Sequence, residues 1–308
     1  MFGIIKIENE EKKMQQQKWK IPKKETFDLT PTFECGQCFR WERETSHSYI
    51  GVFKQNVIRV KQEQDSISFE GICEGTIQDV CTKYFDLETD YEGMQQKLKQ
   101  VDENMKKSIT YGKGIHILNQ DLWETILSFI ISANNNIPRI KGIIERLSKA
   151  YGEEIWWEGK AYYTFPTPKQ LSKANVEDFR KLGLGFRDKR VYETTQRIVQ
   201  GNIVLDELRK ETDFSKLRET LLTFPGVGPK VADCILLFSD LKRWEAFPID
   251  VWVKRVMNEL YLQQNDEKKV KNRQIEQIAY EKFGELAGLA QQYLFYWRRD
   301  EERNRKIS

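Results

Sequence analysis

The stretch from Ser215 to Leu262 limits the possible folds of this chain more than any other. Apolar residues recur at helical spacing on both sides of Pro225-Gly226-Val227-Gly228, which predicts two amphipathic helices joined by a tight turn. We expect Pro229 to open the second helix, because a proline at that position gives up no hydrogen bond. Farther on, Pro248-Ile249-Asp250 combines a stop with a capping carboxylate and predicts a third helix that opens at Asp250.

The two glycines of the turn suggest what it binds. Glycine tolerates positive φ, and main-chain N–H groups at a helix start face outward, where the helix dipole favours anions. The turn at Gly226 and Gly228 is therefore suited to grip a phosphate without reading a base.

Lys230, in the first turn of the second helix, has two interpretations. A lysine beside such a turn can be one more phosphate contact, or it can be a nucleophilic amine that forms a Schiff base with a sugar carbon. The helix dipole lowers the pKa of its ammonium, whereas a nearby Asp250 carboxylate raises that pKa, so the residues alone leave its charge state open. Asp250 is predicted to cap a helix, and a capping carboxylate can also have a catalytic role.

The N-terminal part of the chain has a different periodicity. From Lys20 to about Cys73 the period is near two, and residues 49–53, 56–60 and 66–69 are predicted to be short strands of an antiparallel meander with one face covered. Helical periodicity begins near Ile77, and everything after about Ser108 is predicted to be helical. The predicted class is therefore α+β, with a disordered tail at 1–18, an N-terminal antiparallel β-sheet domain at 19–108 and a mostly α-helical domain at 109–308 that frays from Arg298.

The composition indicates the cellular compartment of the protein more clearly than it indicates the function. Fifty Lys and Arg against 47 Asp and Glu give a net charge of +3, which is compatible with nucleic acid but does not indicate it. Five scattered cysteines argue against a disulfide framework and for a reducing compartment. No apolar run has transmembrane length and the first residues lack a signal-peptide core, so we expect an intracellular protein, in the cytoplasm or nucleoid of a prokaryote or the nucleus of a eukaryote.

Cys35-Gly36-Gln37-Cys38 is a C-x-x-C motif, for which a zinc or redox site is the weaker interpretation. Such a site needs more ligands, and neither the other cysteines nor the two histidines have suitable spacing. No cysteine follows Cys234, so a C-terminal four-cysteine iron–sulfur loop is absent. We expect no metal and no cofactor.

Five segments of the chain resemble the eukaryotic-type 8-oxoguanine DNA glycosylases, which belong to the helix-hairpin-helix (HhH-GPD) superfamily. The segments come in the same order as in that family, and the resemblance extends from about Trp19 to Trp297. They are Gly36–Trp41, Ser132–Arg139, Leu182–Arg187, Leu222–Cys234 and Ala287–Phe295.

The resemblance implies a monomeric DNA glycosylase with AP lyase activity that excises 8-oxoguanine opposite cytosine from duplex DNA by base flipping. Lys230 would attack the sugar, and Asp250 would stabilise the cationic sugar. Gly36 would offer its carbonyl to N7 of the damaged base, which carries a hydrogen where guanine has an acceptor. Cys234 and Phe295 would sandwich the base, and Gln291 would bond its Watson–Crick edge.

The same resemblance implies contacts with the rest of the duplex. Asn134, Arg139 and Arg187 would read the cytosine that is left behind, and Phe186 would fill the vacated stack. The backbone would be held at Gly226, Gly228 and Val231. The chain departs from the family at Trp252, where the eukaryotic enzymes have a histidine that contacts phosphate, and at Phe186, where many have tyrosine.

Two other hypotheses stay open at this point. A glycosylase for another base, such as an alkylated purine, often keeps the aspartate but lacks the lysine, so Lys230 argues against it. A non-catalytic module that clamps DNA explains Gly226 and Gly228, but it leaves Lys230, Asp250 and Gln291 without a shared purpose.

Overall fold

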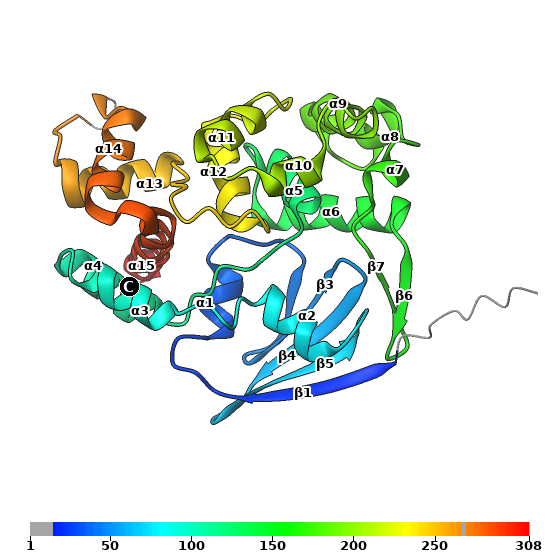
Figure 1. Cartoon of the computed structure of the whole chain (residues 1–308), viewed down its shortest axis with the longest axis horizontal. Coiled ribbons are helices and arrows are strands. Elements are labelled where there is room, and N and C mark those ends of the chain that lie inside the picture. The colour runs from blue at the N-terminus through cyan, green and yellow to red at the C-terminus, as the bar shows by residue number, and fades with distance from the viewer. Residues whose placement is uncertain (1–14, 267–268, 308) are drawn as a thin grey trace, which may run out of the picture.

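The computed structural model describes residues 15–266 and 269–307. A five-stranded antiparallel sheet near the N-terminus is followed by a mostly helical remainder (Figure 1), which confirms the predicted α+β class. The strands lie in the order β1-β5-β4-β3-β2. They are β1 (Gln16–Pro22), β2 (Trp41–Thr45), β3 (Ser48–Phe53), β4 (Asn56–Gln62) and β5 (Ser66–Ile72).

The sequence predicts the three inner strands β3, β4 and β5, whereas its periodicity does not predict the edge strands β1 and β2. β1 pairs with β5, with Trp19 opposite Phe69, and it begins at Gln16, so residues 16–18 of the predicted disordered tail belong to the sheet. The reason is that an edge strand needs only one paired side and tolerates a polar composition. Residues 1–14 of that prediction lie outside the described residues.

Both faces of the sheet are covered, not one as predicted. On one face the aromatic side chains of Tyr49, Phe53 and Phe69 pack in a cluster with α2 (Ile77–Tyr84). On the other face Ile50 and Val52 pack against a two-stranded hairpin. This hairpin is formed by β6 (Glu154–Trp157) and β7 (Lys160–Tyr163).

The hairpin corrects the prediction that everything after Ser108 is helical. Its strands have four residues each, too short for a period to show in the sequence. Their partner surface is also distant in the chain: Trp157 is buried beneath Arg59, whose guanidinium lies 4.7 Å from the Trp157 ring, while Trp156 is 63% exposed. The hairpin thus ties the helical part to the sheet (Figure 1).

The helices surround a second, larger core. Helices α3 and α4, and α13 and α14, gather around the C-terminal helix α15, whereas α5 to α12 stand above the sheet and α1 and α2 lie against it (Figure 1). The helices not yet given bounds are α1 (Leu29–Glu34), α3 (Tyr91–Lys99), α4 (Glu103–Gly112), α5 (Leu122–Ser132), α6 (Ile137–Tyr151), α7 (Pro168–Leu171), α8 (Val176–Lys181), η1 (Gly185–Arg187), α9 (Asp188–Val199), α10 (Leu205–Lys210), α11 (Phe214–Leu222), α12 (Pro229–Phe238), α13 (Val251–Met257), the π-helical turn η2 (Asn258–Leu262), α14 (Asn272–Phe283), η4 (Gly284–Leu286) and α15 (Ala287–Ile307).

The C-terminal helix does not fray at Arg298 as predicted but continues to Ile307. Arg298 forms ion pairs with Glu259 of η2 and with Glu301 one turn further on, so both tertiary and local contacts hold this part of the helix.

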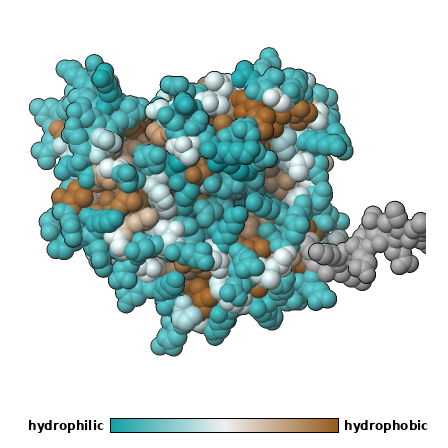
Figure 2. Space-filling view, viewed as in Figure 1, coloured by the Kyte–Doolittle hydropathy of each residue, from teal (hydrophilic) through white to brown (hydrophobic). Residues whose placement is uncertain are grey.

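The surface is mostly hydrophilic on the face shown in Figure 2, where apolar residues gather in small separate areas. Within residues 15–266 and 269–307, no helix has the length and apolar character needed to cross a bilayer.

A buried ion pair joins the segment after α1 to the start of α5. Arg40 Nη1 lies 3.8 Å from Glu124 Oε2, and the Arg40 guanidinium also donates to the Tyr163 carbonyl of the hairpin. Burial raises the pKa of Glu124 from 4.5 to about 7, against the opposing effect of Arg40. Glu124 therefore keeps its proton over a pH range in which an exposed glutamate is ionised.

We expect Glu124→Gln to flatten the pH dependence of stability between about pH 4.5 and 7. The native protein holds this proton where the unfolded chain releases it, so the contribution of Glu124 to the free energy of unfolding is complete below pH 4.5 and is lost as the pH rises through 7. The pKa difference corresponds to at most about 3 kcal/mol.

Urea unfolding at a series of pH values measures this effect. The control is Glu103→Gln, whose carboxylate side chain is 77% exposed and whose curve should run parallel to that of the wild type. A parallel curve for Glu124→Gln as well would contradict the assignment.

Candidate active site and DNA-binding face

The predicted helix-hairpin-helix is present, with Gly228 as the cap and Pro229 as the first residue of α12. Gly226 has φ = +84°, and a Cβ built there would lie 2.4 Å from Arg190 Cδ. Gly228 has an ordinary φ of −96°, and a Cβ there would meet nothing within 4 Å. Gly226 is therefore required by the backbone, whereas Gly228 leaves open space in front of the amides that begin α12.

Lys230 points from the first turn of α12 into the protein. Its Nζ lies 5.3 Å from the ring centre of Phe129 and forms a hydrogen bond with the sulfur of Cys234, one turn further along the helix. Burial lowers the pKa of the ammonium, but Cys234 and Asp250 together outweigh burial and leave the pKa above its ordinary value. Burial also raises the pKa of the Cys234 thiol to about 11. The surroundings of Lys230 thus favour its ammonium form.

Asp250 caps α13, which confirms the predicted third helix. Its Oδ1 accepts a hydrogen bond of 2.7 Å from the Val253 amide. It forms no ion pair with Lys230 in the described part of the chain, yet it lies near enough for its charge to raise the pKa of that lysine. The starts of α12 and α13 therefore bring one amine and one carboxylate to the same region.

A cavity of about 310 Å³ opens beside Asp250, and Phe295 of α15 also lines it. Gly36 lies against the same phenylalanine: a Cβ on Gly36 would be 3.9 Å from Phe295 Cε1. Gln291 stands one helical turn before Phe295 and is buried, with its Oε1 accepting from Gln292 Nε2 at 2.6 Å. The structure thus brings Gly36 close to Phe295, and Phe295 shares its cavity with Asp250.

The loop that carries Gly36 is held by the buried side chain of Gln37. Gln37 Nε2 donates to the carbonyls of Thr32 and His116, at 2.8 and 2.7 Å, and its Oε1 accepts from the Leu118 amide at 2.8 Å. Gly36 itself has φ = +86°, which a glycine adopts without strain. The position of the Gly36 carbonyl is therefore fixed before any ligand arrives.

A second group of predicted residues gathers at the start of α6 and around η1, and none of them lines that cavity. Phe186 is 55% exposed and is flanked by two guanidiniums, those of Arg187 at 4.2 Å and Arg190 at 5.1 Å from its ring centre. Burial, Arg139 and Arg190 lower the pKa of Arg187. Three arginines therefore lie close together beside an exposed ring, an arrangement suited to a polyanion.

Arg187 is already committed to main-chain carbonyls. It donates to Ala133 at 2.9 Å, to Asn134 at 2.7 Å and to Leu184 at 3.3 Å. A second bond to Ala133 leaves one of its five N–H donors unused. Asn134, at φ = +50°, has an exposed side chain, so the loop presents that amide while Arg187 supports it from below.

The sequence analysis did not predict two arginines at these sites, Arg190 and Arg299. Arg190 follows Phe186 by four positions and Arg299 follows Phe295 by four, and each guanidinium lies over the preceding ring, at 5.1 and 5.5 Å from its centre. The i, i+4 spacing of an aromatic residue and an arginine was the available signal, because such pairs face each other on a helix.

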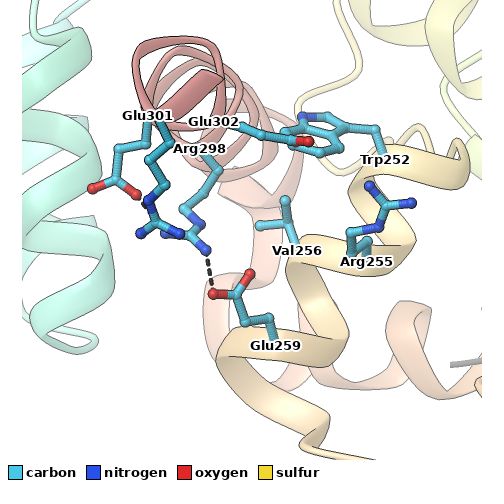
Figure 3. Close-up of a pocket in the computed structure, with 8 residues that line it drawn as sticks. Trp252, Arg255, Val256, Glu259, Arg298, Glu301 and Glu302 are labelled. Carbon is cyan, nitrogen blue, oxygen red and sulfur yellow. Dashed lines mark hydrogen bonds and ion pairs between the residues drawn. The ribbon is translucent and has the colours of Figure 1, made fainter. Parts of the chain in front are cut away.

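Trp252 lies at the boundary between α13 and α15. Its indole N–H is buried and has no hydrogen-bond partner among the described residues. Figure 3 shows Trp252 extending from α13 toward Glu302 of α15, with Arg298 directed at Glu259. At this departure from the family the side chain therefore packs between helices and offers no exposed donor to a phosphate.

The cysteines of the C-x-x-C motif are both buried and unpaired. Burial raises the pKa of Cys35 to about 11 and that of Cys38 further. Within the described ranges no three His, Cys, Asp or Glu side chains form a group that could hold a metal ion.

The two glycines of the hairpin should respond differently to alanine. Gly226→Ala forces a left-handed alanine, at about 1–2 kcal/mol, and displaces Arg190 in addition. Gly228→Ala should leave the free energy of unfolding nearly unchanged, because its φ is ordinary and its Cβ meets nothing. Urea unfolding compares the two variants, and equal losses would contradict this account of the turn.

Family models match almost the whole helical and sheet region. The model of the N-terminal domain of 8-oxoguanine DNA glycosylase matches residues 20–126, and that of the HhH-GPD superfamily of base excision DNA repair proteins matches residues 127–282. The N-glycosylase/DNA lyase of Saccharomyces cerevisiae is 32% identical over 257 residues, which are 76% of this chain and 68% of that protein.

Two solved structures are closely similar. MBOgg1 in complex with a low-affinity DNA ligand is 41% identical, with a TM-score of 0.87 over 94% of this chain and 99% of that one. The 8-oxoguanine glycosylase/lyase of Clostridium acetobutylicum, in complex with double-stranded DNA containing cytosine opposite 8-oxoguanine, is also 41% identical, with a TM-score of 0.85 over 92% of this chain and 98% of that one. Sequence, fold and site geometry agree, and the chain belongs to the 8-oxoguanine DNA glycosylases of the HhH-GPD superfamily.

Proposed function

We propose that this protein excises 8-oxoguanine opposite cytosine from duplex DNA and then cleaves the strand, with Lys230 as the nucleophile. One observation carries the proposal: Lys230 and Asp250 stand at two neighbouring helix starts, and Asp250 shares its cavity with Phe295, against which Gly36 packs. A clamp that only held the backbone would need no amine inside the protein.

The reaction begins from the ammonium form of Lys230. A flipped base that fills the cavity excludes water, which lowers the pKa of the ammonium and frees the amine. Nζ then bonds to C1′ while the C1′–N9 bond breaks, and the base departs with the electron pair and takes up the proton that Lys230 has released. Asp250 stabilises the positive charge that develops on the sugar.

Strand cleavage follows from the same covalent bond. The attached amine passes a proton to O4′ as the C1′–O4′ bond breaks, which opens the sugar ring and gives a Schiff base at C1′. Loss of a proton from C2′ then expels the 3′ phosphate, which breaks the strand on the 3′ side of the lesion.

Selectivity for the oxidised base rests on a carbonyl that is fixed in advance. The Gly36 carbonyl accepts from the N7–H of the lesion and repels the N7 lone pair of guanine. Phe295 and Cys234 enclose the ring faces, and Gln291 bonds the Watson–Crick edge. These roles require the Gly36 loop to keep its position. Three buried hydrogen bonds of the Gln37 side chain stabilise that position.

The duplex is held at two further places. Gly226, Gly228 and Val231 present main-chain amides at the start of α12 to a backbone phosphate. Phe186 enters the vacated stack, and Asn134 and Arg139 read the opposite cytosine while Arg187 holds the loop. We expect the protein to act as a monomer without a cofactor, in the compartment that contains the DNA: the nucleoid of a prokaryotic cell or the nucleus of a eukaryotic one.

Lys230→Gln should abolish the covalent adduct that borohydride traps between protein and an oligonucleotide carrying 8-oxoguanine opposite cytosine. Glutamine has no basic amine and cannot form a Schiff base. The matched control is Lys216→Gln on α11, whose side chain is exposed and which should trap like the wild type. Undiminished trapping by Lys230→Gln would refute the nucleophile, and tight binding by the wild type without turnover would support the clamp.

Asp250→Asn should separate the two roles of this residue. Asparagine still caps α13 through its side-chain oxygen, so the free energy of unfolding should change little. Excision in single-turnover assays should fall about 10²-fold or more, because the charge that stabilises the sugar is gone. Asp250→Ala should lose about 1 kcal/mol of stability as well. Normal excision by Asp250→Asn would show that Asp250 caps α13 and has no catalytic role.

A further inference from the structure

Arg299 connects the two sides of the base cavity. Its Nη1 donates to the Glu34 carbonyl at 2.6 Å, and its guanidinium lies 5.5 Å from the ring centre of Phe295. The Arg299 side chain is only 15% exposed, and it lines the cavity next to Asp250. No role in the reaction proposed above accounts for these contacts.

The carbonyl that Arg299 binds lies at the C-terminal end of α1, just before Gly36. Glu34 is the last residue of α1, where carbonyls lack partners within the helix and the dipole favours a cation. Gly36 follows two residues later, in its left-handed conformation. A guanidinium bonded at Glu34 therefore restrains the segment whose carbonyl faces the base.

The other half of the contact is with α15. The planar guanidinium lies near the Phe295 ring and is also bonded to Asp300 Oδ1 at 3.1 Å, which holds it on the helix. The charge of Arg299 also reaches Cys35, the residue between Glu34 and Gly36. One side chain thus spans from the α1 terminus to the aromatic ring that Gly36 contacts.

We propose that Arg299 is a positioning residue for lesion recognition, which sets the spacing between the Gly36 carbonyl and the Phe295 ring. The inference rests on the proposed roles of Gly36 and Phe295. Discrimination between N–H and a lone pair depends steeply on the distance to the carbonyl, because a hydrogen bond weakens quickly as its geometry worsens. Among the described residues Arg299 forms no hydrogen bond or ion pair with Lys230 or Asp250, so we expect the attack on the sugar to depend on it much less than base recognition does.

The test compares two substrates with the same variants, Arg299→Gln and Arg299→Lys. Excision of 8-oxoguanine opposite cytosine in single turnover should fall about 10²-fold in both, the loss that a small misplacement in a site produces. Cleavage of an abasic site opposite cytosine, which presents no base to be read, should stay within about threefold of the wild type. The lysine variant keeps the charge but lacks the planar fork.

Arg298→Ala is the control on the adjacent position, because Arg298 pairs with Glu259 and Glu301 and not with the base cavity. Equal losses on both substrates, no loss on either, or full rescue by Arg299→Lys would overturn the proposal. Failure of the proposed function itself is distinguishable, because the wild type would then not excise 8-oxoguanine or Lys230→Gln would still form the borohydride adduct.

A second experiment measures binding alone, in a variant that lacks the proposed nucleophile. In a Lys230→Gln background, the ratio of affinities for duplexes with 8-oxoguanine and with guanine at the same position should shrink when Arg299→Gln is added. An unchanged ratio would show that Arg299 does not set recognition.

Discussion

The reversal of the chain at Gly226 is the constraint on which the rest of the site depends. α11 ends at Leu222, and the left-handed Gly226 turns the chain into α12, whose first turn directs Lys230 toward the buried ring of Phe129. The same glycine leaves room for Arg190, which in turn flanks the exposed ring of Phe186. The start of α12, Lys230 and the exposed ring of Phe186, for which three different roles are proposed, therefore depend on one backbone conformation.

The residues proposed to recognise the base lie at opposite ends of the chain. Gly36 follows the first helix, Phe295 belongs to the last, and Asp250 starts a helix between them. The residues that line the cavity belong to the start of α13 and to α15, and Gly36 approaches Phe295 from the segment after α1. The β6–β7 hairpin and the Arg40–Glu124 pair fasten the two parts together, so they stabilise the site without touching it.

The sequence was most informative where local chemistry decides the structure. Proline, glycine and a capping carboxylate set the hairpin and the start of α13, and alternation revealed the three inner strands. The edge strand β1 and the hairpin were not visible, because their partners are distant and their segments are polar or short. That Gly36 meets Phe295 came from family resemblance and not from periodicity. The charge of Lys230 could not be predicted, because burial opposes Cys234 and Asp250 and only the folded arrangement decides their balance.

Because Cys234 and Asp250 raise the pKa of Lys230, its ammonium form is favoured, which has a chemical consequence beyond the proposed reaction. A neutral amine inside a protein condenses with any small aldehyde or open-chain sugar that diffuses in, and each such encounter would silence the enzyme. An ammonium has no lone pair and is inert toward carbonyls. In the proposed reaction, Lys230 therefore stays unreactive toward carbonyl compounds until a flipped nucleotide excludes water from the cavity.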